Sequence, residues 1–294
     1  MPKEHKLQII PLGGLGEVGK NMTIIRYDNQ MIMIDAGLAF PEDDLLGIDI
    51  VIPDYSFVTE NKEQLLGILL THGHEDHIGT IPYLLKDVDA PIFGTALTMG
   101  LIQARLKENN INNFKGNTVK PGQSIKLGRF KIEFIRVSHS IPDAVGLAIH
   151  TPLGAIVHTG DFKLDHTPVT GEILDIYKFA ELGQKGVLCL MSDSTNVEKP
   201  GFTMSERSVG QMFDEVFRNA KERIILASFA SNVHRVQQVI DAAFKNNRKV
   251  AIVGRSMQNY ATIAAELGYL NIPEGVLLDV DEIVKLPNSQ VCII

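Results

Sequence analysis

The segment 69–80 constrains the fold most. It reads LLTHGHEDHIGT and places three histidines and two carboxylates within six residues, directly after the apolar run 65–70. That run predicts a buried strand. Because side chains at i and i+2 of an extended chain point the same way, His72 and His74 should converge on one point. Asp76 and His77 lie past a turn and should face a second point, with a helix beginning at about residue 78.

This density of ligand-type side chains indicates metal binding. Neutral imidazoles and carboxylates suit borderline divalent ions, Zn²⁺ first and Mn²⁺ next. A single histidine near a strand end is more often structural or solvent-facing. Burying so many polar groups without a partner, however, would cost several kcal/mol. We therefore predict two divalent metal ions side by side.

Two later strands end in further ligand-type residues. The predicted strand 130–137 leads into His139, which we expect to be the third histidine on the first ion. The strand 155–158 ends in HTGDF, where Asp161 is placed to bridge the two ions. Four other histidines lack such context and are expected to be structural or surface residues: His5, His150, His158 and His166.

Residues 13–21 form a glycine-rich segment that contains the spacing G-x-G-x-x-G. This spacing occurs in dinucleotide-binding sites, but only where a helix starts at the glycines. Here the residues up to 34 instead read as a hairpin of two strands. We expect the glycines to let the backbone pass close to a site, where Asn21 can hydrogen-bond.

Asp35 ends the predicted strand 31–35. A carboxylate at a strand end can orient a metal-binding histidine by accepting a hydrogen bond from the ring nitrogen that does not bind the metal. We expect Asp35 to support the histidine segment in this way. The alternative is an ordinary loop cap.

From residue 223 onward the pattern runs strand, helix, strand, helix, which indicates a parallel α/β unit. We predict strands at 186–193, 223–229 and 249–253, and a helix over 206–221 capped by Ser205. Ligands of parallel sheets lie beyond the carboxyl ends of the strands. That edge carries donors suited to phosphate, namely Ser231, Asn232, His234, Arg235, Arg255 and Ser256. A helix start rich in Ser and Asn is equally well explained as a cap.

The charge balance bounds the possible partners. The 294 residues carry a formal net charge of −7, which argues against a generic polyanion binder. The distribution is uneven, because residues 199–255 carry ten basic and five acidic side chains. Metal ions would also neutralise part of the acidic charge near their site. A nucleic-acid substrate is therefore compatible with the net charge.

Nothing in the sequence suggests a membrane. No apolar run approaches the roughly 18 to 20 residues of a membrane span, and residues 1–7 lack a signal-peptide type of apolar segment. Cys189 and Cys292 each lie in an apolar run, where we expect small buried side chains rather than a disulfide framework. These features favour a cytoplasmic protein.

Several motifs together resemble known proteins. The H-x-H-x-D-H of residues 72–77, with Asp35, His139 and Asp161, is similar in ligand order to hydrolases of the metallo-β-lactamase fold. Asp193 opens a D-S-T motif that resembles the β-CASP branch of that fold, which acts on nucleic acids. The strings GGLGEVGKN, THGHEDHIGTIPYLL, HSIPDAVG, SDSTN, ASNVHR and GRSM resemble bacterial ribonuclease J across almost the whole chain.

This resemblance implies an α/β fold: a metallo-β-lactamase-type αββα sandwich with an inserted β-CASP domain, a parallel sheet flanked by helices. The catalytic domain would span 1–204 and the β-CASP domain 205–294, incomplete at its C-terminus. Family members are longer, so the chain resembles an N-terminal portion.

The resemblance also implies a ligand set and an activity. His72, His74 and His139 would hold one ion, Asp76 and His77 the other, and Asp161 both; the implied catalytic residues are Asp76, His77, Asp161 and Asp193. The implied reaction is hydrolysis of RNA, endonucleolytic and 5′→3′ exonucleolytic, favouring 5′-monophosphorylated RNA. The implied partners are further copies of the chain or a paralogue, in dimers or tetramers, and components of RNA-decay complexes.

Two alternatives stay open. A small-molecule hydrolase of the same fold, such as a thioesterase or lactonase, would need no basic insertion. A non-catalytic scaffold subunit would be expected to lose parts of the metal motif, which is intact here.

Overall fold

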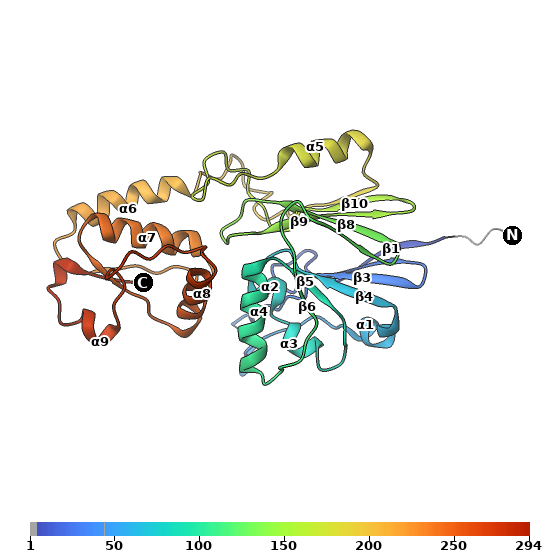
Figure 1. The fold of residues 1–294 in the computed structure, drawn as a ribbon, viewed down its shortest axis with the longest axis horizontal. Helices are drawn as coiled ribbons and strands as arrows, with labels where there is room; N and C mark the ends of the chain where they lie inside the picture. The colour runs from blue at the N-terminus through green and yellow to red at the C-terminus, as the bar shows by residue number, and fades with distance from the viewer. Residues whose placement is uncertain (1–4, 44) are drawn as a thin grey trace. The chain divides into compact units, whose positions relative to one another are not determined.

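The computed structural model describes residues 5–43 and 45–294, which form two compact units (Figure 1). The first unit comprises the chain up to Val137 together with Asp143–Phe162 and Asp175–Asp193. The second comprises Ser138–Pro142, Lys163–Leu174 and Ser194–Ile294. Each unit is built around its own β-structure.

A six-stranded sheet of the first unit carries the histidine segment. Its strands follow chain order: β1 (Leu7–Gly13), β2 (Met22–Tyr27), β3 (Gln30–Ile34), β4 (Leu65–Leu69), β5 (Ile92–Gly94) and β6 (Gly116–Thr118). The first three strands pair antiparallel and the rest join in parallel. The predicted hairpin is confirmed, and no helix follows the glycines of residues 13–19, so the dinucleotide fingerprint is excluded.

A five-stranded sheet packs against the first one. Its order is β11 (Cys189–Met191), β10 (Gly154–His158), β9 (Val145–Thr151), β8 (Phe130–Arg136) and β7 (Ser124–Leu127). Ile25 and Ile34 of one sheet and Phe130 and Phe134 of the other belong to the same buried cluster. Fully burying a side chain of this size contributes roughly 1.5–3 kcal/mol, so this layer is the core of the unit.

Helices cover the outer faces of the two sheets. On the side of the first sheet lie α1 (Ser56–Glu60), α2 (Glu75–Ile78), α3 (Ile81–Leu84) and α4 (Ala96–Glu108) (Figure 1). On the second sheet, Leu182 and Phe179 of α5 (Ile176–Lys185) pack against Ala148 and Val157. The predicted αββα sandwich is confirmed.

The second unit contains a three-stranded parallel sheet in the order β12 (Ile224–Ile225), β14 (Val291–Ile293) and β13 (Lys249–Ala251). Its helices are α6 (Arg207–Asn219), α7 (Val233–Lys245), α8 (Arg255–Glu266) and α9 (Val280–Ile283). Each of the outer strands leads into a helix, α7 after β12 and α8 after β13. The predicted parallel α/β unit is confirmed.

Several predicted boundaries were wrong. The expected strands at 186–193 and 223–229 shrink to β11 and β12, because only three and two of their residues pair with a neighbouring strand. Helix α2 begins at Glu75 rather than near residue 78, and two carboxylates in its first turn suit the positive end of the helix dipole. Glu206 occupies the N-cap position of α6, but Ser205 still caps the helix, since its Oγ accepts a hydrogen bond from the backbone N–H of Arg207 at 3.2 Å.

The two cysteines are free thiols. Cys292 is fully buried, and burial raises the pKa of its thiol to about 12. Among the described residues, no helix combines the length and the apolar character that a membrane span requires.

Glu133 of β8 generates a stability prediction. Its Oε1 accepts a hydrogen bond from Lys131 Nζ at 2.7 Å, and Oε2 lies 2.7 Å from Lys178 Nζ. Partial burial acts to raise the pKa of Glu133, but the two lysines lower it to about 2. A depressed carboxyl pKa contributes stability above the unfolded-state value of 4.5, and this contribution is lost as pH falls toward 2.

We therefore expect Glu133→Gln to lower the free energy of unfolding by about 1 kcal/mol at pH 7, since the lysines stay partly solvated. Urea denaturation at pH 7, 4 and 3 measures the effect. The difference in the free energy of unfolding between variant and wild type should become smaller toward pH 3. An equal difference at all three pH values would refute the lowered pKa of Glu133.

Candidate metal centre

Asp35 lies buried behind the histidine segment. It follows β3 directly, is 1% exposed and adopts a left-handed backbone conformation with φ of 57°. Its Oδ2 lies 2.8 Å from His77 Nδ1, and its Oδ1 accepts a hydrogen bond from the backbone N–H of Thr71 at 2.8 Å. The carboxylate therefore fixes the His77 ring and leaves Nε2 to face the opposite side.

Thr71 joins this network, a role that was not predicted from the sequence. It is fully buried, and its Oγ1 donates to Asp35 Oδ2 at 2.9 Å. The same oxygen lies 3.0 Å from His72 Nδ1 and 3.4 Å from His77 Nδ1. One sequence feature could have identified Thr71: it is a hydroxyl residue directly before the first histidine, at the end of a buried strand.

Ligand-type atoms gather on the far side of these rings. His77 Nε2 lies 3.4 Å from Asp161 Oδ1 and 3.5 Å from Asp76 Oδ2, and His72 Nε2 lies 3.9 Å from Asp161 Oδ2. One ligand atom each of His72, His77 and Asp161 lie within 4.8 Å of one another. Donor atoms at such distances can surround a single ion.

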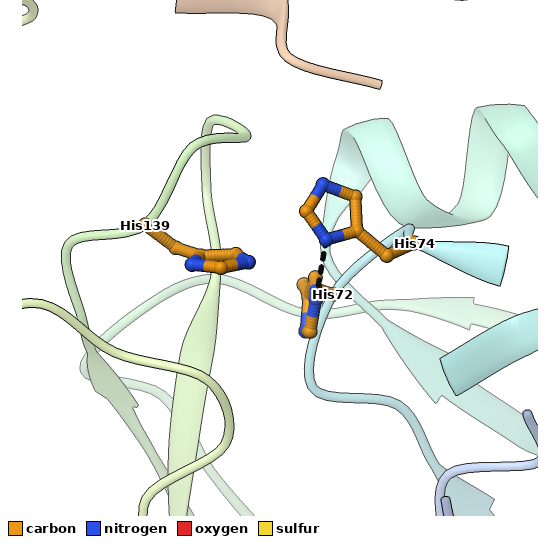
Figure 2. A group of neighbouring side chains, drawn as sticks. All are labelled: His72, His74 and His139. Atoms are coloured by element: carbon orange, nitrogen blue, oxygen red, sulfur yellow. Dashed lines mark hydrogen bonds between the residues drawn. The ribbon is translucent and has the colours of Figure 1, made fainter. Parts of the chain in front are cut away.

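A second group shares His72 with the first. One ring nitrogen each of His72, His74 and His139 lie within 4.8 Å of one another (Figure 2). His72 Nε2 is 3.1 Å from His74 Nδ1, and the two rings meet edge to face. His139 comes from the loop between β8 and β9. The two groups contain five of the six predicted metal ligands, and the sixth, Asp76, borders the first group.

The electrostatics of the centre favour a cation. Burial alone would lower the pKa of His77, but the carboxylates of Asp35 and Asp161 raise it well above its usual range. Burial acts to raise the pKa of Asp76, yet its contact with His77 lowers it overall. Carboxylates concentrated around a buried imidazole stabilise positive charge at this site. With imidazoles as the other donors, this set fits Zn²⁺ or Mn²⁺.

Asn21 brings the glycine-rich segment against α2. Its backbone N–H donates to the carbonyl of Asp76 at 3.1 Å, and its Nδ2 donates to the same oxygen at 3.1 Å. Asn21 Nδ2 also lies 3.2 Å from His77 Nε2. The backbone thus passes close to the centre, as expected from the glycines.

Helix α4 is tied to the loops on both sides of it. Near its end, Arg105 forms an ion pair and hydrogen bond with Glu75, the first residue of α2. At its start, Asp143 accepts hydrogen bonds from the hydroxyl of Thr95 at 2.8 Å and from the backbone N–H of Leu97 at 2.9 Å. These bonds hold two segments that border ligand residues.

Asp193 follows β11, where its backbone N–H donates to Thr159 Oγ1 at 3.0 Å. Its carboxylate belongs to neither group of ligand atoms identified in the described part of the chain. A catalytic role for Asp193 stays a prediction.

The predicted phosphate-binding residues lie at the starts of α7 and α8. Because β12 and β13 run parallel, both helix starts are at the same edge of the sheet of the second unit. Asn232 caps α7 by accepting from the backbone N–H of Arg235 at 3.0 Å, and Arg235 is paired with Glu206. Ser231 is partly buried next to this cap, whereas Arg255 and Ser256 are exposed. Their role in binding stays a prediction.

His234 differs from this group because it is only 8% exposed. Burial lowers the pKa of its imidazole to about 4, so the ring is neutral near pH 7. A buried neutral ring is a poor surface contact for phosphate.

Gly37 generates a second prediction. A Cβ at this position would overlap the carbonyl oxygen of Asp76, because the segment after β3 runs against α2. We expect Gly37→Ala to lower the free energy of unfolding by about 1–3 kcal/mol, as overpacking does, and to weaken metal binding. Thermal denaturation and a metal titration measure the two effects.

Gly183 supplies the matched control, since it lies within α5 and a Cβ there would meet nothing within 4 Å. Gly183→Ala should leave stability unchanged or raise it by about 0.5–1 kcal/mol. Equal behaviour of the two variants would show that no close approach exists at Gly37.

Comparison with known proteins adds to this geometry. A family model described as "Metallo-beta-lactamase superfamily" matches residues 15–191, and one described as "Ribonuclease J, beta-CASP domain" matches 221–294. The chain is 49% identical to "Ribonuclease J" of Synechocystis sp. over 97% of its length, and 45% identical to "Ribonuclease J" of Helicobacter pylori over 98%. These matches span 45% and 42% of the relatives, so the chain spans less than half of their length.

A solved structure, a protein of unknown function from Enterococcus faecalis V583, is similar in fold. It superposes with a TM-score of 0.73 at 19% identity, covering 98% of this chain and 77% of the other. At that identity the likeness supports the fold alone.

Proposed function

The chain belongs to the metallo-β-lactamase superfamily, and from this premise we propose that it is part of a metal-dependent ribonuclease that hydrolyses RNA phosphodiester bonds. One observation carries the proposal: two groups of ligand-type atoms share His72, and Asp161 lies beside both His72 and His77. The names of the relatives and the β-CASP match supply the substrate class.

The proposed centre holds two divalent ions. His72, His74 and His139 would bind one ion, Asp76 and His77 the other, and Asp161 both. Two such ions can activate water and stabilise the charge that develops on the phosphoryl oxygens. Asp35 and Thr71 keep the imidazoles oriented through the hydrogen bonds described above. We assign catalytic roles to Asp76, His77, Asp161 and Asp193.

The RNA is proposed to bind along the second unit. Its phosphates would meet the starts of α7 and α8, where Ser231, Asn232, Arg235, Arg255 and Ser256 offer donors. His234 belongs to the same predicted set but is buried. Not every basic side chain is available for this, since Arg248 is 3% exposed and donates to the carbonyls of Ala220 and Glu222. We propose that residues 1–204 form the catalytic domain and 205–294 the β-CASP domain.

The remaining parts of the proposal concern the whole protein. It would cut RNA internally and also degrade it from a 5′-monophosphorylated end, in RNA processing and mRNA decay in the cytoplasm. It would act as a dimer or tetramer, alone or with a paralogue, together with components of an RNA-decay complex. A small-molecule hydrolase is not favoured, since residues 221–294 match the β-CASP domain, and the intact ligand groups disfavour a scaffold.

The test uses the full-length protein with RNA carrying either a 5′-monophosphate or a 5′-triphosphate. We expect faster decay of the monophosphorylated RNA, and loss of all cleavage with a chelator. His77→Ala should lower cleavage by about 100-fold or more while RNA is still bound, because it removes a ligand but leaves the second unit intact.

The matched control is His166→Ala, since His166 is exposed and outside both ligand groups. It should cleave as the wild type does. Cleavage that survives both the chelator and His77→Ala would refute the metal-dependent mechanism.

A further inference from the structure

His234 contacts a proposed metal ligand rather than solvent. Its imidazole forms a hydrogen bond with the backbone of His139. Its Nε2 is buried and has no hydrogen-bond partner among residues 5–43 and 45–294, so Nδ1 makes the bond to His139. This bond acts to raise the pKa of the imidazole, so the ring donates the hydrogen and a backbone oxygen accepts it. Nδ1–H therefore donates to the carbonyl of His139.

The loop 138–142 that carries His139 has separate anchors on either side of this bond. The carbonyl of Ser138 accepts from the backbone N–H of Lys163 at 2.7 Å, and the hydroxyl of Ser138 donates to the carbonyl of Glu172 at 3.2 Å. On the other side, Asp143 caps α4. His234 instead acts on the peptide unit of His139 itself, from which the ligand side chain projects.

Helix α7 holds His234 in a defined place. The neighbouring Val233 and Val236 are 1% and 2% exposed, so this turn of the helix is packed in the core of the second unit. Asn232 caps the helix, and the carbonyl of Glu206 accepts from Gln238 Nε2 at 2.9 Å. The donor nitrogen of His234 is thus fixed by its own packing.

We propose that His234 is a positioning residue that fixes the His139 loop and so sets the metal affinity of the centre. The inference rests on the proposed metal centre and deepens it, because it makes α7 a support for a metal ligand. A ligand must be held within about 0.5 Å of its working position, and loss of such supporting bonds weakens metal affinity by about 10- to 100-fold. His234 therefore acts before any RNA binds.

The test compares three variants of the full-length protein. His234→Asn keeps an N–H close to the position of Nδ1, His234→Gln moves it toward Nε2, and His234→Leu has no donor. Each is titrated with Co²⁺ without RNA, and the visible absorption reports affinity and coordination. We expect Asn to bind like the wild type, and Gln and Leu to bind about 10- to 100-fold more weakly with an altered spectrum.

Thermal denaturation of the metal-free proteins separates this effect from unfolding. If Leu fails to fold, the Asn and Gln pair still decides, because both keep a polar side chain at the position. Wild-type Co²⁺ affinity in folded Gln or Leu, or an equal loss in folded Asn, would overturn the proposal; weaker RNA binding alone would mark His234 as a phosphate contact. Wild-type protein that binds no Co²⁺ would instead refute the metal centre on which the inference rests.

Discussion

The site depends on the hydrogen bonds of one buried carboxylate, that of Asp35. An isolated buried charge is very costly, but here it accepts hydrogen bonds from the backbone and hydroxyl of Thr71 and contacts His77. Asp35 follows β3, and Thr71 follows β4. The backbone N–H of Asp35 donates to Leu69 at 2.9 Å, which extends the parallel pairing of these strands. The imidazoles are therefore oriented only when the central strands of the first sheet are paired.

The fold adds the remaining donors from the other sheet. Asp161 follows β10, and His139 follows β8, so each donor is delivered by the end of a strand. Glycines let the backbones come close enough, as Gly37 does at the carbonyl of Asp76. The packing of the two sheets therefore also positions the polar cluster at their edge. A larger side chain at Gly37 would displace the backbone of Asp76, which is a proposed ligand.

The features that were predicted correctly are those that short stretches of sequence determine. The ligand types of residues 72–77 are concentrated in one motif, and the hairpin and the parallel α/β unit follow from local patterns. Pairing partners are not encoded locally, so the lengths of β11 and β12 were overestimated. Thr71 was missed for the same reason, since its role depends on Asp35, 36 residues away. His234 was predicted as a phosphate contact, which stays a prediction, and its contact with His139 could not be predicted because the two residues are far apart in the sequence.

The central claim is that two ions share one site whose ligands follow the ends of three strands, β4, β8 and β10. Anomalous diffraction at the zinc and manganese edges, from crystals of the full-length protein, tests it most directly. The account predicts two peaks about 3.5–4 Å apart, one within bonding distance of His72, His74 and His139 and the other of Asp76 and His77, with Asp161 between them. No peak at these side chains, in crystals grown with either metal, would contradict it.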